Sequence, residues 1–281
     1  IVSGGTFVSG STVITLYGAV DAASSVNLTG VVAWSTCNFA SSGGCSWPSS
    51  NSNGNGVFSI GNAGGSYYGS LPSLIVGPVS ISACVLTTQN TDTCAAALNI
   101  QGSLNAPCAV SDTATSIISF AQVSTLLTIT GVNCTSLGIG DVVSGAVNVV
   151  GVNILPSSQG FHARQVDAAS SMNLTDVAST MGVSFWGNSG PITIARCTLS
   201  SIYVSDVIGG PFTVSDTTIS APNGGMKFDN GIKGPVTLTN VNVTATSYPA
   251  LQIRSPNSLF KPSPSLTSAS LSIQGGRYTV D

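Results

Sequence analysis

Charged residues are scarce in this sequence of 281 residues. Asp, Lys and Arg together make up 6% of the chain, glutamate does not occur, and no lysine or arginine precedes Arg164. In an ordinary soluble domain about a quarter of the residues are charged. The formal net charge is −3, and the few basic residues form no cluster. We therefore expect neither nucleic acid nor an anionic membrane surface as a partner.

Long apolar runs and a secretion signal are also missing. Gly, Pro, Ser or Thr interrupts the apolar stretches, including residues 71–86, so no membrane-spanning segment is expected. The chain begins at Ile1 without a basic segment followed by an apolar one, so any targeting signal is expected to have been removed or to lie outside this sequence. Apolar residues still make up 42% of the chain, which is enough for a large core.

The remaining composition favours strands in an oxidising compartment. Val, Ile, Thr, Ser, Gly and Asn are abundant, whereas helix-forming Glu, Lys and Arg are rare or absent. The seven cysteines lack metal-ligand spacing, so we expect disulfides in a secreted or cell-surface protein, with no metal and no cofactor. The pairs Cys37–Cys45 and Cys84–Cys94 are predicted to close loops, and Cys197 is predicted to stay unpaired.

Internal repeats are the strongest signal in the chain. The decapeptide at residues 20–29 recurs at residues 166–175 with nine identities, which indicates a duplication of about residues 1–140 and 141–281 within one domain of residues 1–281. A shorter repeat begins with Gly-Pro at four places: Gly77, Gly190, Gly210 and Gly234. The two repeats predict a protein built from stacked, related units.

Each Gly-Pro unit alternates apolar and polar residues, inserts one extra residue, and then resumes alternation. Because a strand alternates with period two, the extra residue marks a corner after which apolar side chains face inward again. Gly, Asn and Asp tolerate the left-handed backbone that a sharp corner needs. The predicted corner residues are Gly30, Gly131, Asp176, Arg196, Asp216 and Asn240. A further apolar pair after each corner strand gives every unit three short strands.

These units predict an all-β fold, a right-handed parallel β-helix of about ten to twelve rungs stacked about 4.8 Å apart. An antiparallel β-sandwich is the alternative, because it also has short alternating strands. The fixed column of corner residues favours the β-helix. Two cysteines one rung apart in one column would lie close enough for a disulfide, and we predict such a bond between Cys108 and Cys134.

The units that begin at Gly225, Gly234 and Ala250 resemble rungs of the pectate lyase and polygalacturonase superfamily of right-handed parallel β-helices. Residues 90–92 and 252–254 resemble polygalacturonase motifs, but the adjacent Asp pair and the Gly-His-Gly of those enzymes are absent. Glycoside hydrolysis needs two carboxylates at a fixed separation. The resemblance therefore implies the fold, and we do not expect catalysis.

Lyases of this superfamily use an Arg or Lys base beside calcium-binding aspartates, and Lys227, Asp229 and Arg254 come nearest to such a set. The rung pattern places them in neighbouring columns of adjacent rungs, facing outward. Together with Trp186 and Tyr203 they predict a groove that binds acidic sugars by aromatic stacking and by pairing with carboxylates. The alternative is a surface ion pair of Asp229 and Arg254, worth less than about 1 kcal/mol.

Two further sets of polar residues fall on outward positions. Four sequons for N-linked glycans, which would aid solubility at such low charge, lie at Asn27, Asn133, Asn173 and Asn242. A rank of hydroxyls, of the kind that ice-binding solenoids present, is formed by Ser80, Thr193, Thr213 and Thr237. Ordinary threonines favoured by β propensity are the alternative explanation of that rank.

We expect a non-catalytic extracellular structural or adhesive glycoprotein, as a subunit of a surface filament, appendage or matrix. Its partners would be further copies or other extracellular subunits, because the ends of a solenoid present strand edges that must be capped or stacked. A β-helix protein that binds or degrades polysaccharide is the first alternative. An ice-binding solenoid is the second.

Overall fold

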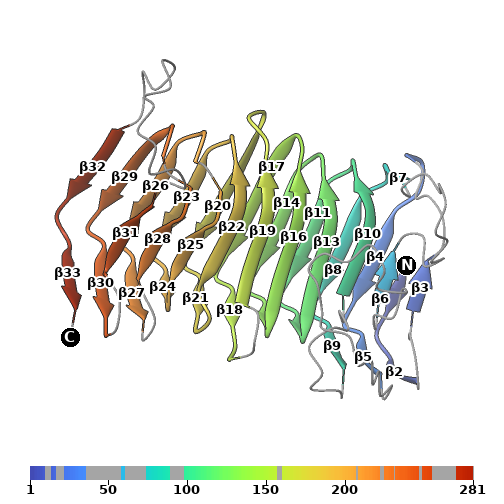
Figure 1. The fold of residues 1–281 in the computed structure, drawn as a ribbon. Coiled ribbons are helices and arrows are strands. Elements are labelled where there is room, and N and C mark those ends of the chain that lie inside the picture. Colours follow the sequence, from blue (N-terminus) through green and yellow to red (C-terminus); the bar gives the residue numbers. More distant parts are fainter. Residues whose placement is uncertain are drawn as a thin grey trace, which may run out of the picture.

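A computed structural model describes the chain at residues 1–9, 14–16, 22–35, 58–60, 74–88, 98–156, 160–206, 208–221, 225–230, 232–246, 249–254 and 270–280. All regular elements in these ranges are strands, in keeping with the strand-rich composition. The strands form three sheets, which we call A, B and C (Figure 1).

The three sheets contain eleven strands each. Sheet A consists of β1 (Val2–Ser3), β4 (Val26–Thr29), β8 (Val79–Ser82), β11 (Cys108–Ser111), β14 (Leu127–Thr130), β17 (Gly145–Val150), β20 (Ser170–Thr175), β23 (Ile192–Ala195), β26 (Phe212–Ser215), β29 (Pro235–Thr239) and β32 (Ser270–Gln274). Sheet B consists of β2 (Thr6–Ser9), β5 (Val32–Ser35), β9 (Val85–Thr88), β12 (Ala114–Thr115), β15 (Asn133–Cys134), β18 (Asn153–Ile154), β21 (Ala178–Ser179), β24 (Thr198–Leu199), β27 (Thr218–Ala221), β30 (Asn242–Ala245) and β33 (Arg277–Val280). Sheet C consists of β3 (Ile14–Leu16), β6 (Phe58–Ile60), β7 (Leu74–Ile75), β10 (Leu98–Leu104), β13 (Ile117–Val123), β16 (Ser136–Val142), β19 (Gly160–Val166), β22 (Val183–Asn188), β25 (Ile202–Val204), β28 (Met226–Phe228) and β31 (Leu251–Ile253).

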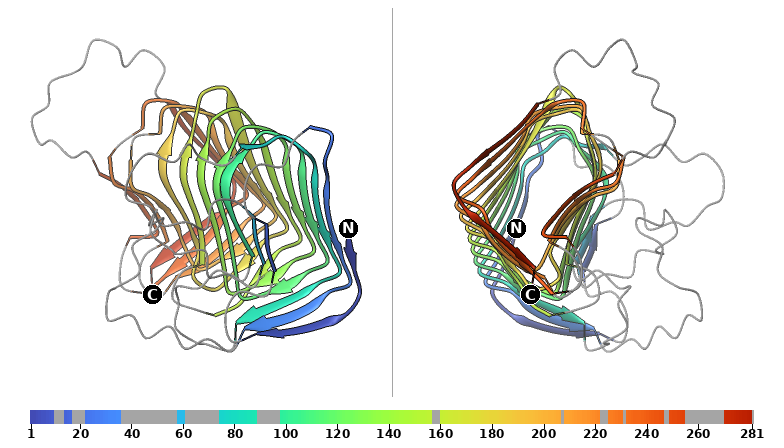
Figure 2. Two further views of the ribbon diagram at one scale, coloured as in Figure 1. Left: turned by 90° about the vertical axis from the view of Figure 1, so that its right-hand side faces the viewer. Right: turned by 60° about the vertical axis from the view of Figure 1, so that its left-hand side comes forward.

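The chain visits the sheets in the order A, B, C and then starts the next coil. Over most of the stack, neighbours within a sheet are therefore three strands apart in sequence, and each pair is parallel. Figure 2 shows the coils stacked around a common interior. The predicted three-strand parallel β-helix is confirmed, and the antiparallel sandwich is wrong. The right-handed sense stays a prediction, based on the usual hand of parallel crossovers.

The corner between sheets A and B is set by one residue with a left-handed backbone in every rung. All six predicted corner residues have this conformation, and the full column has φ values between 47° and 65°. The column consists of Gly4, Gly30, Ala83, Asp112, Gly131, Gly151, Asp176, Arg196, Asp216, Asn240 and Gly275. Each corner is tied to the next rung by its backbone, as where the Asn240 N–H donates to the Gln274 carbonyl at 2.8 Å.

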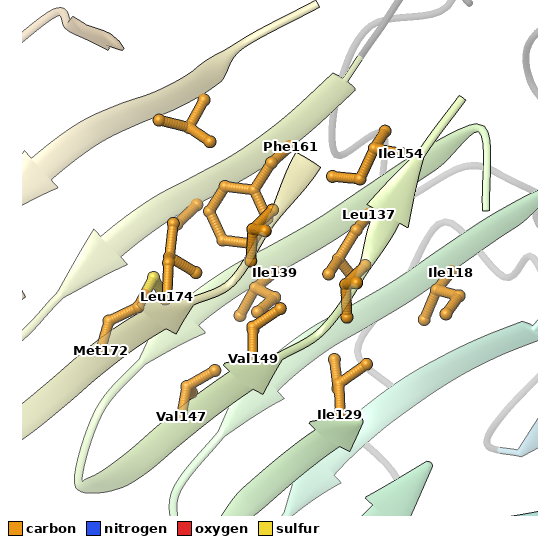
Figure 3. Packing of buried hydrophobic residues seen from close by; sticks show 14 of the residues in the cluster. Ile118, Ile129, Leu137, Ile139, Val147, Val149, Ile154, Phe161, Met172 and Leu174 are labelled. Carbon is orange, nitrogen blue, oxygen red and sulfur yellow. The ribbon is translucent and has the colours of Figure 1, made fainter. Parts of the chain in front are cut away.

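Apolar side chains from all three sheets fill the interior. Ile194 and Leu238, two of the residues expected to face inward, are fully buried. Figure 3 shows how side chains such as Val149, Phe161 and Leu174 meet inside the coil. A chain of aromatic contacts continues this core, with ring centroids 5.7 to 5.9 Å apart, through Phe161, Phe185, Phe212 and Phe228. One continuous core therefore runs along the described stack.

The similarity between the two decapeptide regions continues over four consecutive rungs. The decapeptides contribute β4 and β20 to sheet A. The buried position just after the corner then follows the same order twice: Val31, Cys84, Thr113 and Val132, and again Val177, Cys197, Thr217 and Val241. The hydrogen bonds match as well, because Cys84 Sγ donates to the Leu28 carbonyl and Cys197 Sγ donates to the Leu174 carbonyl.

The predicted disulfide between Cys108 and Cys134 is wrong. Cys108 begins β11 in sheet A, whereas Cys134 ends β15 in sheet B, so the two never share a column. Both are free and buried, and burial raises the pKa of each thiol to about 12.

The other predicted disulfides have no support in the described chain. Cys84 is a free, buried thiol, which contradicts the predicted bond to Cys94, and Cys94 itself lies outside the described residues. Cys37 and Cys45 also lie outside them. Cys197 is free, as predicted.

Candidate functional site

The outer face of sheet C carries four side chains that contact one another. Lys227 lies between the buried residues Met226 and Phe228, so the alternation of β28 turns it outward. It is in register with Tyr203 of β25. Asp229 follows β28 directly, and Arg254 follows β31 in the next rung. We call Tyr203, Lys227, Asp229 and Arg254 the sheet C cluster.

Asp229 is the centre of this cluster. Its Oδ2 accepts a hydrogen bond from the Tyr203 hydroxyl at 2.7 Å and forms an ion pair with Lys227 Nζ at 2.8 Å. The same Nζ lies 4.9 Å from the centroid of the Tyr203 ring. Three groups are thus held in a fixed arrangement across two adjacent rungs, as the predicted grouping requires.

Arg254 is held more loosely than Lys227. Its nearer guanidinium nitrogen lies 3.8 Å from Asp229 Oδ1, which is beyond hydrogen-bond distance. The Arg254 side chain is 53% exposed, compared with 35% for Lys227 and 21% for Asp229. Asp229 Oδ1 is buried and accepts no hydrogen bond from the described part of the chain. Arg254 therefore keeps donors available for a ligand.

The titration of the cluster follows from these contacts. Burial alone would raise the pKa of Asp229, but the hydrogen bonds from Lys227 and Tyr203 and the charges of Lys227 and Arg254 outweigh it, so the pKa lies below its usual value. The hydrogen bond to Asp229 raises the pKa of Tyr203. At neutral pH the cluster is therefore an anion flanked by two cations and a protonated phenol.

Trp186 lies on the same face, one strand before the cluster. Its side chain projects outward from β22, one strand before Tyr203, and is 38% exposed. The register of β19 and β22 places the exposed Arg164 beside it. The row that contains both includes Arg164, Trp186, Ser205, Asp229 and Arg254. The sequence analysis did not single out Arg164, although aligning β19 with the later rungs would have placed it in this row.

The cluster itself lacks a pair of catalytic carboxylates. It contains one carboxylate, whereas a glycoside hydrolase needs two. No group of three or more His, Cys, Asp or Glu side chains able to hold a metal ion occurs in the described ranges. Residues 90–92 lie outside the described residues. His162 lies two rungs before Tyr203 on the same face, and burial lowers its pKa.

The four sequons are divided between two other faces. Asn27 and Asn173 lie on the outer face of sheet A and are partly buried; the Asn173 side chain donates to Asn148 Oδ1 at 2.9 Å. Asn133 and Asn242 begin β15 and β30 in sheet B, and both are exposed. All four therefore point away from the core, and none lies on the face of the sheet C cluster.

The expected hydroxyl rank also lies on sheet A. Thr193, Thr213 and Thr237 are directly in register on β23, β26 and β29. Ser80 stands in the same row, but the row is interrupted at Ala109 and at the asparagines of β17 and β20. Ser272 of β32 continues the row after Thr237, so the regular part of the rank is four rungs long.

No family model matches the chain, and neither a curated protein nor a solved structure is significantly similar to it. In the described part of the chain no helix is long and apolar enough to cross a membrane.

Proposed function

We propose that this chain is a non-catalytic extracellular structural or adhesive glycoprotein that binds acidic polysaccharide on the outer face of sheet C. The observation that carries the proposal is the sheet C cluster. On a chain with only 6% charged residues, Asp229 fixes one lysine and stands beside an exposed arginine on the same face. Such an arrangement suits a ligand that carries spaced carboxylates.

The binding chemistry follows from the geometry of the cluster. Arg254 has guanidinium donors free for a two-point contact with a sugar carboxylate. Lys227 is held in place by Asp229 and by the Tyr203 ring, so little side-chain entropy is lost when it binds. Trp186 offers an exposed aromatic surface on which a sugar ring can stack. A rigid parallel sheet keeps all these groups at fixed separations.

We also propose that the chain is related to the pectate lyase and polygalacturonase superfamily. The resemblance of the rungs at Gly225, Gly234 and Ala250 supports a uronate polymer as the ligand class. The single carboxylate of the cluster supports binding without turnover. Ligand binding on a rigid coil is compatible with a role in adhesion.

The extracellular location and the glycans rest on the sequons. Asn133 and Asn242 are exposed at the start of short strands, where a glycan can be attached without entering the core. The four cysteines of the described ranges are free, so these four give no support to secretion through disulfides. A mass spectrum before and after enzymatic deglycosylation tests this part, and unmodified Asn133 and Asn242 in protein from a secreting eukaryotic host would contradict it.

Self-association is the remaining part of the proposal. In β32 and β33, side chains that continue the buried columns are exposed, among them Leu271, Ile273 and Val280. Another rung, from this chain or another subunit, would cover them. Sedimentation and electron microscopy test whether copies associate into filaments. An ice-binding role of the sheet A rank is tested separately by thermal hysteresis.

Polysaccharide binding is tested with polygalacturonate, using neutral dextran as the control ligand. Calorimetry is expected to show binding of polygalacturonate alone, weakened about tenfold by Lys227→Gln and by Arg254→Gln, since each loses one charge-assisted contact. Arg196→Gln, at the A–B corner, is the matched control and should bind like the parent. Equal affinity of all variants would contradict the proposal, and release of reducing ends that Arg254→Gln abolishes would indicate an enzyme instead.

A further inference from the structure

We infer that the acidic glycan has a second anchor at Arg164 and Trp186, so that the ligand runs across the rungs from β31 to β19; this inference rests on the proposed function. Arg164 is exposed, and none of the ion pairs formed by the described residues involves it. It shares a row of sheet C with Arg254, and Trp186 lies between them on the rung after Arg164. The two arginines therefore stand at opposite ends of one line of outward residues.

The distance between Arg164 and Arg254 sets the length of the ligand that can reach both. From β19 to β31 there are four steps between hydrogen-bonded neighbours. At about 4.8 Å a step, Arg164 and Arg254 are about 19 Å apart along the stack, which an extended oligosaccharide of about four residues would span. A shorter ligand reaches one arginine only. Affinity should therefore rise with ligand length until both anchors are occupied.

The charges beside this line set the spacing of the ligand's carboxylates. The neighbouring outward row of sheet C contains Asp141 and Asp206, and Asp167 follows β19. Together with Asp229 these carboxylates outnumber the cations Arg164, Lys227 and Arg254 on this face. A polysulfate with more than one charge per sugar would meet more repulsion than a uronate chain with one carboxylate per sugar, whose terminal carboxylates can reach Arg164 and Arg254. The face thus selects spaced uronates over polysulfates.

Trp186 supplies the contact between the two anchors. Its ring is 38% exposed and stands beside Arg164 on one side and Ser205 on the other. A sugar ring over Trp186 would place the adjoining residue near Arg164. The same indole would report on the ligand by a change in its fluorescence.

The inference is tested by calorimetry with oligogalacturonates of increasing length on the full chain. The parent should gain affinity up to about four residues, the span of the line, and then level off. Arg164→Gln should bind the dimer like the parent but lose about tenfold in affinity for the tetramer, because one charged contact is removed. Trp186→Phe should lose the fluorescence change. Dextran sulfate should compete poorly with the tetramer.

The outcomes separate this inference from the proposed function. If Arg254→Gln weakens binding and Arg164→Gln has the parent's affinity at every ligand length, the second anchor is wrong and the cluster remains the site. If neither variant changes the affinity, the proposed function fails as well. Circular dichroism of Arg164→Gln matching the parent is required, and Arg277→Gln, in sheet B, is the control for loss of a positive charge elsewhere.

Discussion

The carbonyl oxygen of Gly190 lies 2.6 Å from the position that a β-carbon on Gly210 would occupy. The carbonyl oxygen of Ser189 lies 2.5 Å from the same point. Neither glycine has a left-handed backbone, so the requirement at this Gly-Pro position is room for the adjacent rung. The repeated glycine before β23, β26 and β29 is therefore explained by close approach of successive coils.

Gly210→Ala should lower the free energy of unfolding by about 2–3 kcal/mol, because the added methyl group overlaps two backbone oxygens and the coils must separate. Urea unfolding followed by circular dichroism measures the change. Gly187→Ala is the matched control, since its nearest neighbour would lie at 3.6 Å. It should change stability by less than about 1 kcal/mol. Equal midpoints for the two variants would contradict this explanation.

Ala83→Gly should stabilise the protein by about 0.5 kcal/mol, because Ala83 has a φ of 50° and a β-carbon strains that conformation. The gain is smaller than the relieved strain, since glycine also makes the unfolded chain more flexible. Ala114→Gly, in β12, removes a methyl from an ordinary strand position and should cost about 1 kcal/mol. If Ala83→Gly and Ala114→Gly destabilise the protein equally, a strained left-handed backbone at Ala83 is excluded.

Much of the fold was predictable because two local rules decide it. Period-two alternation placed Ile194 and Leu238 inside, and the tolerance of Gly, Asn and Asp for a left-handed backbone marked corners such as Asn240. Position within a rung was harder to predict, because rung lengths vary. Sequence spacing therefore put Cys108 and Cys134 in one column although they lie in different sheets.

The sequence predicted the members of the sheet C cluster but not their contacts. Alternation turned Tyr203 and Lys227 outward, but the bond from Tyr203 to Asp229 depends on side-chain reach across two rungs. Arg164 was missed because no core pattern constrains an outward residue. Only the register of β19 with β22 shows that it stands beside Trp186.

The buried amide of Asn188 is predicted to destabilise the folded protein. Its side chain is 5% exposed, and neither polar atom has a hydrogen-bond partner among the described residues. Its neighbours in the inward column are Val166 and Ile208. Asn188→Val should therefore raise the free energy of unfolding by about 1–2 kcal/mol, because an unpaired buried amide is removed. Calorimetric melting measures it, and a melting temperature below that of the parent would contradict the destabilising role of the amide.

Asp229 should make the free energy of unfolding depend on pH in the acidic range. Since its pKa in the folded protein lies below the unfolded value, the ionised form favours folding above the unfolded pKa, and this contribution is lost as the pH falls through the folded pKa. The parent should therefore be more stable than Asp229→Asn at pH 7, and the difference should begin to shrink near the unfolded pKa of about 4 and vanish only below the folded pKa. Tyr203→Phe should move that loss to higher pH. A difference that is constant from neutral to acidic pH would exclude this role.

The most direct test of the account is a crystal structure of the full chain with tetragalacturonate. The account predicts one carboxylate on the Arg254 guanidinium and Lys227, a sugar ring over Trp186, and a second carboxylate at Arg164. An oligosaccharide bound on the outer face of sheet A or B, or an empty sheet C face at saturating ligand, would contradict it.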